Sequence, residues 1–123
     1  MTYLDTHAVV WLYEGTATRF GKAALHAIRH DNLLVSPAVI LELQLLHEIR
    51  RLTQGGDAIV DAVSELGVQV CHLGFRSVVD SSLDLKWVRD PFDRLIVAHA
   101  RANDAALITK DENIRRHYKR AIW

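Results

Sequence analysis

The sequence predicts an α/β fold in which a mostly parallel sheet of about five short strands is covered by helices on both faces. Short apolar segments alternate along the chain with longer segments of helical periodicity, a pattern typical of parallel sheets with helical crossovers. Half of the 123 residues are hydrophobic, so we expect residues 1–123 to form one domain with its own core. Right-handed crossovers would bring the carboxyl ends of the strands to one edge, where such sheets bind ligands.

The first half of the chain is expected to supply two strands. Residues 2–5 are a short apolar run that ends at Asp5, and residues 32–35 are a second such run. Helical periodicity separates and follows these runs. The expected helices here are residues 6–13, 21–30 and 37–52.

The second half is expected to supply three more strands. Gly55 and Gly56 separate the preceding helix from the next one, and Gly67 is placed to end that next helix. Asp90 and Pro91 have the residue types preferred at the N-cap and first position of a further helix. The expected helices are residues 57–66, 75–86 and 91–103, and the expected strands are residues 68–73, 105–109 and 121–123.

Composition excludes several classes of protein. Lys and Arg together number 15, as do Asp and Glu, so no global charge attracts nucleic acid or a membrane. Basic residues gather in the second half, where they are either a footprint for phosphates or a solvated surface. Cys71 is the single cysteine, which fits a reducing compartment. Without a signal segment or an apolar run of roughly 20 residues, we expect a soluble cytoplasmic protein without a membrane partner.

Two acids stand on helix faces that are otherwise apolar. In the helix 37–52, the neighbours of Glu42 at helical spacing are all apolar: Ala38, Val39, Leu45, Leu46 and Ile49. Asp93 shares its face with Ile96, Val97 and Ala100, whereas Arg94 takes the outer side. If these stripes face the core, each carboxylate costs several kcal/mol of folding free energy unless it binds a cation or a proton.

Two further acids follow expected strands, namely Asp5 and Asp111. Hard divalent cations such as Mg²⁺ and Mn²⁺ prefer oxygen ligands, so four acids in these positions predict a divalent-cation site suited to phosphodiester hydrolysis. Each acid except Glu42 also has a structural alternative. Asp5, Asp90 and Asp111 are candidate helix caps, and Asp93 is the candidate N3 partner of Asp90 in a capping box.

Four segments carry a resemblance to a known family: Tyr3–Ala8, Val35–Leu43, Arg89–Ala98 and Leu107–Asp111. In order and spacing they resemble a PIN-domain ribonuclease, specifically a VapC-family toxin of a type II toxin–antitoxin system. The most specific of them is the Asp-Pro-Phe-Asp-Arg-Leu-Ile run that begins at Asp90. The resemblance extends over the full length of the chain.

The resemblance implies a three-layer α/β/α sandwich that forms a homodimer. It also implies a VapB-like antitoxin whose C-terminal tail covers the active site. Carried over by position, it implies that Asp5, Glu42, Asp93 and Asp111 form the catalytic Mg²⁺ or Mn²⁺ site, with support from the hydroxyls of Thr6 and Thr109. The candidate contacts to RNA phosphates are Arg89, Arg94, Lys110, Arg115 and Arg116.

The expected activity is metal-assisted cleavage of single-stranded or loop RNA, leaving 5′-phosphate and 3′-hydroxyl ends. Phosphatases of the haloacid-dehalogenase type need a second Asp two residues after the first, where this chain has His7. Two alternatives remain open at this point. One is an RNA-processing PIN nuclease without an antitoxin, and the other is a domain that binds RNA or antitoxin without catalysis.

Overall fold

The computed structural model describes residues 1–123 and contains one sheet of five parallel strands in the order β3-β2-β1-β4-β5. The strands are β1 (Thr2–Leu4), β2 (Leu33–Val35), β3 (Gln69–Val70), β4 (Ala106–Ile108) and β5 (Ala121–Ile122). The helices are α1 (Thr6–Glu14), α2 (Lys22–His30), α3 (Pro37–Glu48), α4 (Gly56–Ser64), α5 (Phe75–Ser82), α6 (Pro91–Ala102) and α7 (Glu112–His117), with a 3₁₀ turn, η1, at Ala17–Arg19. None of the helices has the length and apolar character that a membrane crossing requires.

The predicted α/β fold is confirmed, since every predicted strand and helix is present. Two of the helices, α3 and α5, end four residues earlier than predicted. The helix α3 stops at Glu48 because Arg50 adopts a left-handed backbone conformation, with φ of 64°. The helix α5 stops at Ser82, where the Arg94 side chain donates hydrogen bonds to the Ser82 and Leu83 carbonyls and so satisfies the helix end.

Two elements were not among the predicted ones, the 3₁₀ turn η1 and the helix α7. Both are too short for a hydrophobic period to emerge from the sequence. The available signal for α7 was its cap, because Asp111 accepts a hydrogen bond from the Ile114 N–H at 2.9 Å.

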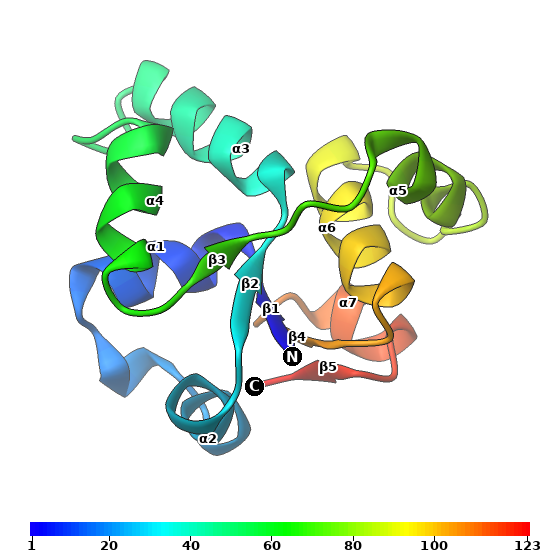
Figure 1. Cartoon of the computed structure of the whole chain (residues 1–123), viewed down its shortest axis with the longest axis horizontal. Helices are drawn as coiled ribbons and strands as arrows, with labels where there is room; N and C mark the ends of the chain where they lie inside the picture. Colours follow the sequence, from blue (N-terminus) through cyan, green and yellow to red (C-terminus); the bar gives the residue numbers. More distant parts are fainter.

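The helices form two layers around the sheet, as Figure 1 shows. The helices α1, α3 and α4 pack on one another on one side of the sheet, and α5, α6 and α7 lie on the other. The chain reaches the β2 and β3 side first and then crosses to β4 and β5. The direction of winding therefore reverses at β1, and the crevice beyond the carboxyl ends of β1 and β4 is the usual ligand position in such a sheet.

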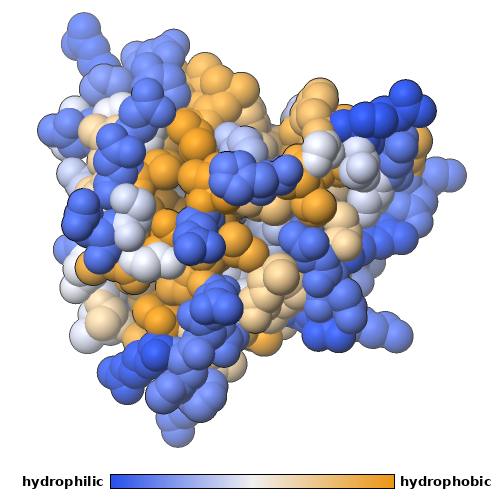
Figure 2. Space-filling view, in the orientation of Figure 1, coloured by the Kyte–Doolittle hydropathy of each residue, from blue (hydrophilic) through white to orange (hydrophobic).

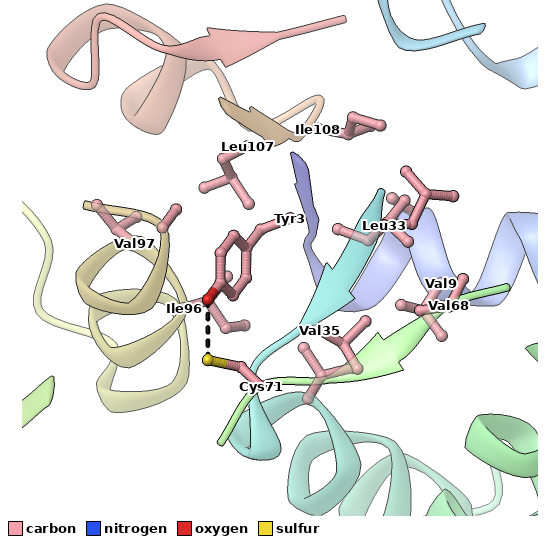
Figure 3. Close-up of a cluster of buried hydrophobic side chains, with 14 of the residues drawn as sticks. Tyr3, Val9, Leu33, Val35, Val68, Cys71, Ile96, Val97, Leu107 and Ile108 are labelled. Atoms are coloured by element: carbon pink, nitrogen blue, oxygen red, sulfur yellow. Dashed lines mark hydrogen bonds between the residues drawn. The ribbon is translucent and has the colours of Figure 1, made fainter. Parts of the chain in front are cut away.

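The core is continuous through the sheet because the central strands are buried on both faces. Tyr3 joins three segments inside it. Its hydroxyl donates to Cys71 Sγ at 2.9 Å (Figure 3), and it accepts from Asn103 Nδ2 at 2.6 Å. Burial also raises the pKa of the Tyr3 hydroxyl far above its ordinary value, so it stays protonated. Cys71 is buried and packs in the core as a small hydrophobic side chain.

We predict that α3 and α4 are held at a spacing that only glycine allows. A Cβ atom on Gly56 would lie 2.3 Å from the Ile40 carbonyl oxygen, which is backbone and cannot move aside. The substitution Gly56→Ala should lower the free energy of unfolding by about 1–3 kcal/mol, as overpacking of a core does. Urea denaturation measures the effect.

The matched control is Gly55→Ala. Its Cβ would lie 2.7 Å from Gln44 Oε1, the end of a flexible side chain, and the Gly55 backbone is in an extended conformation open to alanine. It should cost less than about 1 kcal/mol. Equal losses in the two variants would contradict the role assigned to Gly56.

Candidate metal centre

Asp5 lies between the end of β1 and the start of α1, and it is 8% exposed. Its Oδ1 accepts the Ala8 N–H at 2.8 Å, so the N-cap role weighed from the sequence is confirmed. Burial raises the pKa of the Asp5 carboxyl, and hydrogen bonds from the Thr109 hydroxyl and the Ala8 N–H partly oppose that rise. The Asp5 side chain therefore caps α1 and is also one of the candidate metal ligands.

Glu42 lies on α3, half-buried, and its Oε1 accepts a short hydrogen bond from the Thr6 hydroxyl. The expectation that its whole stripe faces the core was wrong. Leu45 is 40% exposed and Ile49 is 62% exposed, whereas the core-facing side of α3 is formed by Val39 and Leu43. Glu42 lies next to the buried stripe of α3 and not within it. Its side chain therefore points along the edge of the core toward the other acids.

Asp93 is in the first turn of α6, above buried Ile96 and Val97, as the sequence predicted. Loss of solvent raises the pKa of its carboxyl to about 7, and the nearby charges of Asp90, Glu42, Asp111 and Asp5 add to the rise. Near neutral pH, this group therefore binds a proton in the absence of another cation.

Asp90 caps α6, since its Oδ1 accepts the Asp93 N–H at 3.0 Å. This confirms the capping role predicted for it, but the structure adds a second one. One carboxylate oxygen each from Glu42, Asp90 and Asp93 lies within 4.8 Å of the other two. Sequence reasoning left Asp90 out of the candidate site, although its spacing from Asp93 places both carboxylates on the first turn of one helix.

Asp111 caps α7 and is exposed. Its backbone N–H donates to the Thr109 hydroxyl oxygen at 3.1 Å, so Thr109 contacts the backbone of one acid and the side chain of another, Asp5. Thr6 and Thr109 thus both support acids by hydrogen bonds, in the places predicted for them.

One cavity of about 360 Å³ collects these groups at the carboxyl edge of β1 and β4. It is lined by Asp5, His7, Trp11, Glu42, Asp93, Lys110 and Asp111. The four acids singled out in the sequence are therefore brought together. The helices that carry Glu42 and Asp93 are fixed to each other by a buried contact, in which Ser36 Oγ lies 2.8 Å from His99 Nδ1.

The acids of this cavity have no arginine partner. The ion pairs of the protein join Arg76 to Asp80, Arg101 to Asp84 and Arg120 to Asp104, all outside the cavity. Lys110 is the only basic side chain in the lining other than His7. A half-buried group of carboxylates with so little compensation fits a hard divalent cation.

The candidate phosphate contacts separate into three groups. Lys110 lines the acidic cavity. The Arg94 side chain is half-buried and donates to the Ser82 and Leu83 carbonyls at the end of α5, and its assignment as a phosphate contact stays a prediction. Arg89, Arg115 and Arg116 are exposed and lie outside the cavity lining.

A second, apolar hollow of about 350 Å³ lies between α3, α5 and α6. Leu41 and Phe75 stand on its rim and are 54% and 72% exposed. Figure 2 shows hydrophobic surface on both sides of the hollow that separates α3 from α5 and α6. By contrast, the apolar segment Trp11–Tyr13 is partly buried: Trp11 and Leu12 pack against the core and Tyr13 is 38% exposed.

Comparison with solved structures finds the same fold. VapBC2 from Rickettsia felis, in a structure with a DNA fragment from its promoter, matches with a TM-score of 0.72 and 17% identity over 100% of this chain and 98% of the other. A toxin–antitoxin complex from Klebsiella pneumoniae matches with a TM-score of 0.71 and 18% identity over 100% and 97% of the two chains.

Comparison of sequences identifies the family. The family model of the PIN domain matches residues 2–120. Ribonuclease VapC22 of Mycobacterium tuberculosis (strain ATCC 25618 / H37Rv) is 32% identical over 118 residues, which cover 93% of this chain and 89% of the relative. Both matches agree with the motifs seen in the sequence, and this chain therefore belongs to the PIN-domain family, in its VapC branch.

Proposed function

We propose that this protein is a metal-dependent endoribonuclease that acts as the toxin of a type II toxin–antitoxin pair in the cytoplasm. The observation that carries the enzymatic part is the meeting of four acids from separate segments in one cavity without an arginine partner. The toxin part rests on the VapC relative and on the likeness to solved toxin–antitoxin complexes.

Asp5, Glu42 and Asp93 would hold the cation, Mg²⁺ or Mn²⁺, and Asp111 would complete the negative cavity. When bound, such a cation polarises the phosphoryl oxygen, activates water at neutral pH and stabilises the leaving oxygen. Thr6 holds Glu42 in place through its hydroxyl, and Thr109 does the same for Asp5. Lys110 offers the cavity a positive charge that an RNA phosphate can contact.

The apolar hollow between α3, α5 and α6 supports a second proposal, on partners. Exposed Phe75 and Leu41 on its rim are large apolar side chains that a folded protein usually covers. We assign this hollow to the interface of a homodimer, and the acidic cavity to the binding of the C-terminal tail of a VapB-like antitoxin.

Light scattering of the antitoxin-free protein tests the first assignment. Phe75→Asp should convert a dimer into a monomer, because it places a charge in the apolar interface. A monomeric parent protein would contradict the assignment.

Replacement of one acid should abolish catalysis and leave the fold intact. Asp93→Asn keeps the shape of the side chain and removes its charge, so we expect RNA cleavage in Mg²⁺ or Mn²⁺ to fall at least about a hundredfold, because metal catalysis contributes several kcal/mol. The assay uses a mixed RNA pool and purified, antitoxin-free protein, with EDTA in a parallel reaction.

The matched control is Asp80→Asn, an acid of the same type that pairs with Arg76 on the exposed side of α5. It should cleave at the parental rate. Metal-dependent cleavage that survives Asp93→Asn would contradict the assignment, and so would a parent protein that is folded but binds neither Mg²⁺ nor Mn²⁺.

The stability of the metal-free protein should depend on pH through Asp93. The folded-state pKa of this carboxyl is about 7, whereas its ordinary value is 3.8, so between these values the folded protein holds the proton more tightly than the unfolded chain does. The contribution of Asp93 to the free energy of unfolding therefore falls as pH rises from 4 to 7, and this loss is nearly complete above pH 7.

Asp93→Asn removes this penalty. In EDTA, the variant should be more stable than the parent at pH 8, and the difference should shrink as pH falls toward 4. Urea denaturation at several pH values measures both free energies. If the difference in free energy of unfolding between variant and parent is constant with pH, ionisation of the Asp93 carboxyl does not destabilise the metal-free protein.

A further inference from the structure

The acidic cavity has an aromatic side that the metal chemistry does not use. His7 and Trp11 line it together, one turn apart on α1. Their ring centroids are 6.1 Å apart with 49° between the ring planes. His7 is exposed, and Trp11 lies half-buried behind it. We call these two side chains the aromatic pair.

Trp11 is fixed in place by other aromatic rings. Its centroid lies 6.2 Å from that of Phe20 and 5.4 Å from that of Trp123, and both contacts are edge-to-face. Such contacts stabilise a particular orientation of the ring. Trp11 is thus a fixed part of the cavity wall, and His7 is the member of the aromatic pair that is exposed to solvent.

Positive charge lies beside the aromatic pair. Lys110 Nζ is 5.9 Å from the ring centroids of both Trp11 and Trp123, and Arg19 Cζ is 5.6 Å from the centroid of Trp11. Single-stranded nucleic acids are bound by this combination of stacking rings and cations that follow the backbone.

The acids next to the aromatic pair make this combination necessary for an RNA substrate. Asp5, Glu42, Asp93 and Asp111 repel a phosphate that approaches the cavity, and one cation neutralises only part of that charge. Attraction for the substrate must then come from groups on the rim. The bases of RNA offer flat apolar faces to such a rim only when they are unpaired.

We propose that the aromatic pair binds an unpaired base next to the phosphate that enters the acidic cavity, while Lys110 contacts a neighbouring phosphate. This inference rests on the proposed nuclease function and adds the residues that would bind an unpaired base beside the cleaved bond, His7 and Trp11. Paired RNA is excluded because its bases present edges and not faces. His7 and Trp11 are positioning residues in this account.

Binding of RNA to a catalytically inactive parent tests the inference apart from the nuclease activity. The parent is the full chain with Asp93→Asn. The probes are a mixed-sequence RNA hexamer and an abasic hexamer of the same length and charge, each with a fluorescent label for anisotropy. The added substitutions are His7→Ala, His7→Phe, Lys110→Gln and the control His26→Ala, which changes an exposed histidine outside the cavity lining.

The expected results separate stacking from charge. His7→Ala should weaken binding of the base-bearing hexamer about tenfold, within the range of one stacked base, and leave the abasic hexamer unaffected. His7→Phe should restore binding to within about threefold, because it keeps a flat ring. Lys110→Gln should weaken both hexamers alike and lower the salt dependence by about one phosphate contact. His26→Ala should change neither.

Two results would overturn the inference. One is equal affinity of the inactive parent for the base-bearing and abasic hexamers. The other is a His7→Phe variant as weak as His7→Ala, which would assign His7 a polar role in place of stacking. If these binding results hold while the unsubstituted protein cleaves no RNA, the nuclease proposal fails and the base-binding surface stands.

Discussion

The pairing of β1 with β4 is the contact on which the site depends. The Asp5 N–H donates to the Ile108 carbonyl at 3.1 Å, so the residue after β1 is fixed beside the residue after β4, which is Thr109. The pairing of β1 with β2 places the start of α3, and hence Glu42, on the other side of Asp5. The sheet reverses its winding at β1, and helices from its two sides therefore begin at the same crevice. A shift of either pairing by one residue would separate the acids and move each side chain of the shifted strand to the opposite face of the sheet.

The helix caps and the acidic site are one arrangement. Asp5, Asp90 and Asp111 each accept a backbone N–H at the start of a helix, namely α1, α6 and α7. The positive ends of three helix dipoles therefore face the region where the carboxylates gather, and they offset part of the repulsion between them. Burial nevertheless raises the pKa of both Asp5, which is a cap, and Asp93, which is not, and that of Asp93 reaches about 7. The metal-free protein is thus destabilised at two acids whose negative charge a bound cation would offset.

Much of this was predictable from the sequence, and the failures have physical causes. Strand positions, the capping acids and the four site acids follow from local patterns that the structure keeps. The orientation of α3 was wrong because exposed Leu45 and Ile49 look like core residues to a periodicity argument, although they lie on the surface. The hydrogen bonds of Arg94 to the end of α5 were not predicted, because sequence does not reveal which carbonyls its guanidinium reaches. The surroundings of the aromatic pair required the fold, since Lys110 and Trp123 reach Trp11 from the far end of the chain.

We infer that β1, α3 and α6 bring Asp5, Glu42 and Asp93 into one cavity that holds a divalent cation. The direct measurement is anomalous diffraction from crystals of the antitoxin-free protein soaked in Mn²⁺ at pH 8, above the pKa of Asp93. The account predicts an anomalous peak among the carboxylates of Asp5, Glu42 and Asp93, and no such peak in crystals of the Asp93→Asn variant. A well-ordered cavity without a peak, or Mn²⁺ bound only at other acids such as Asp80, would contradict the claim.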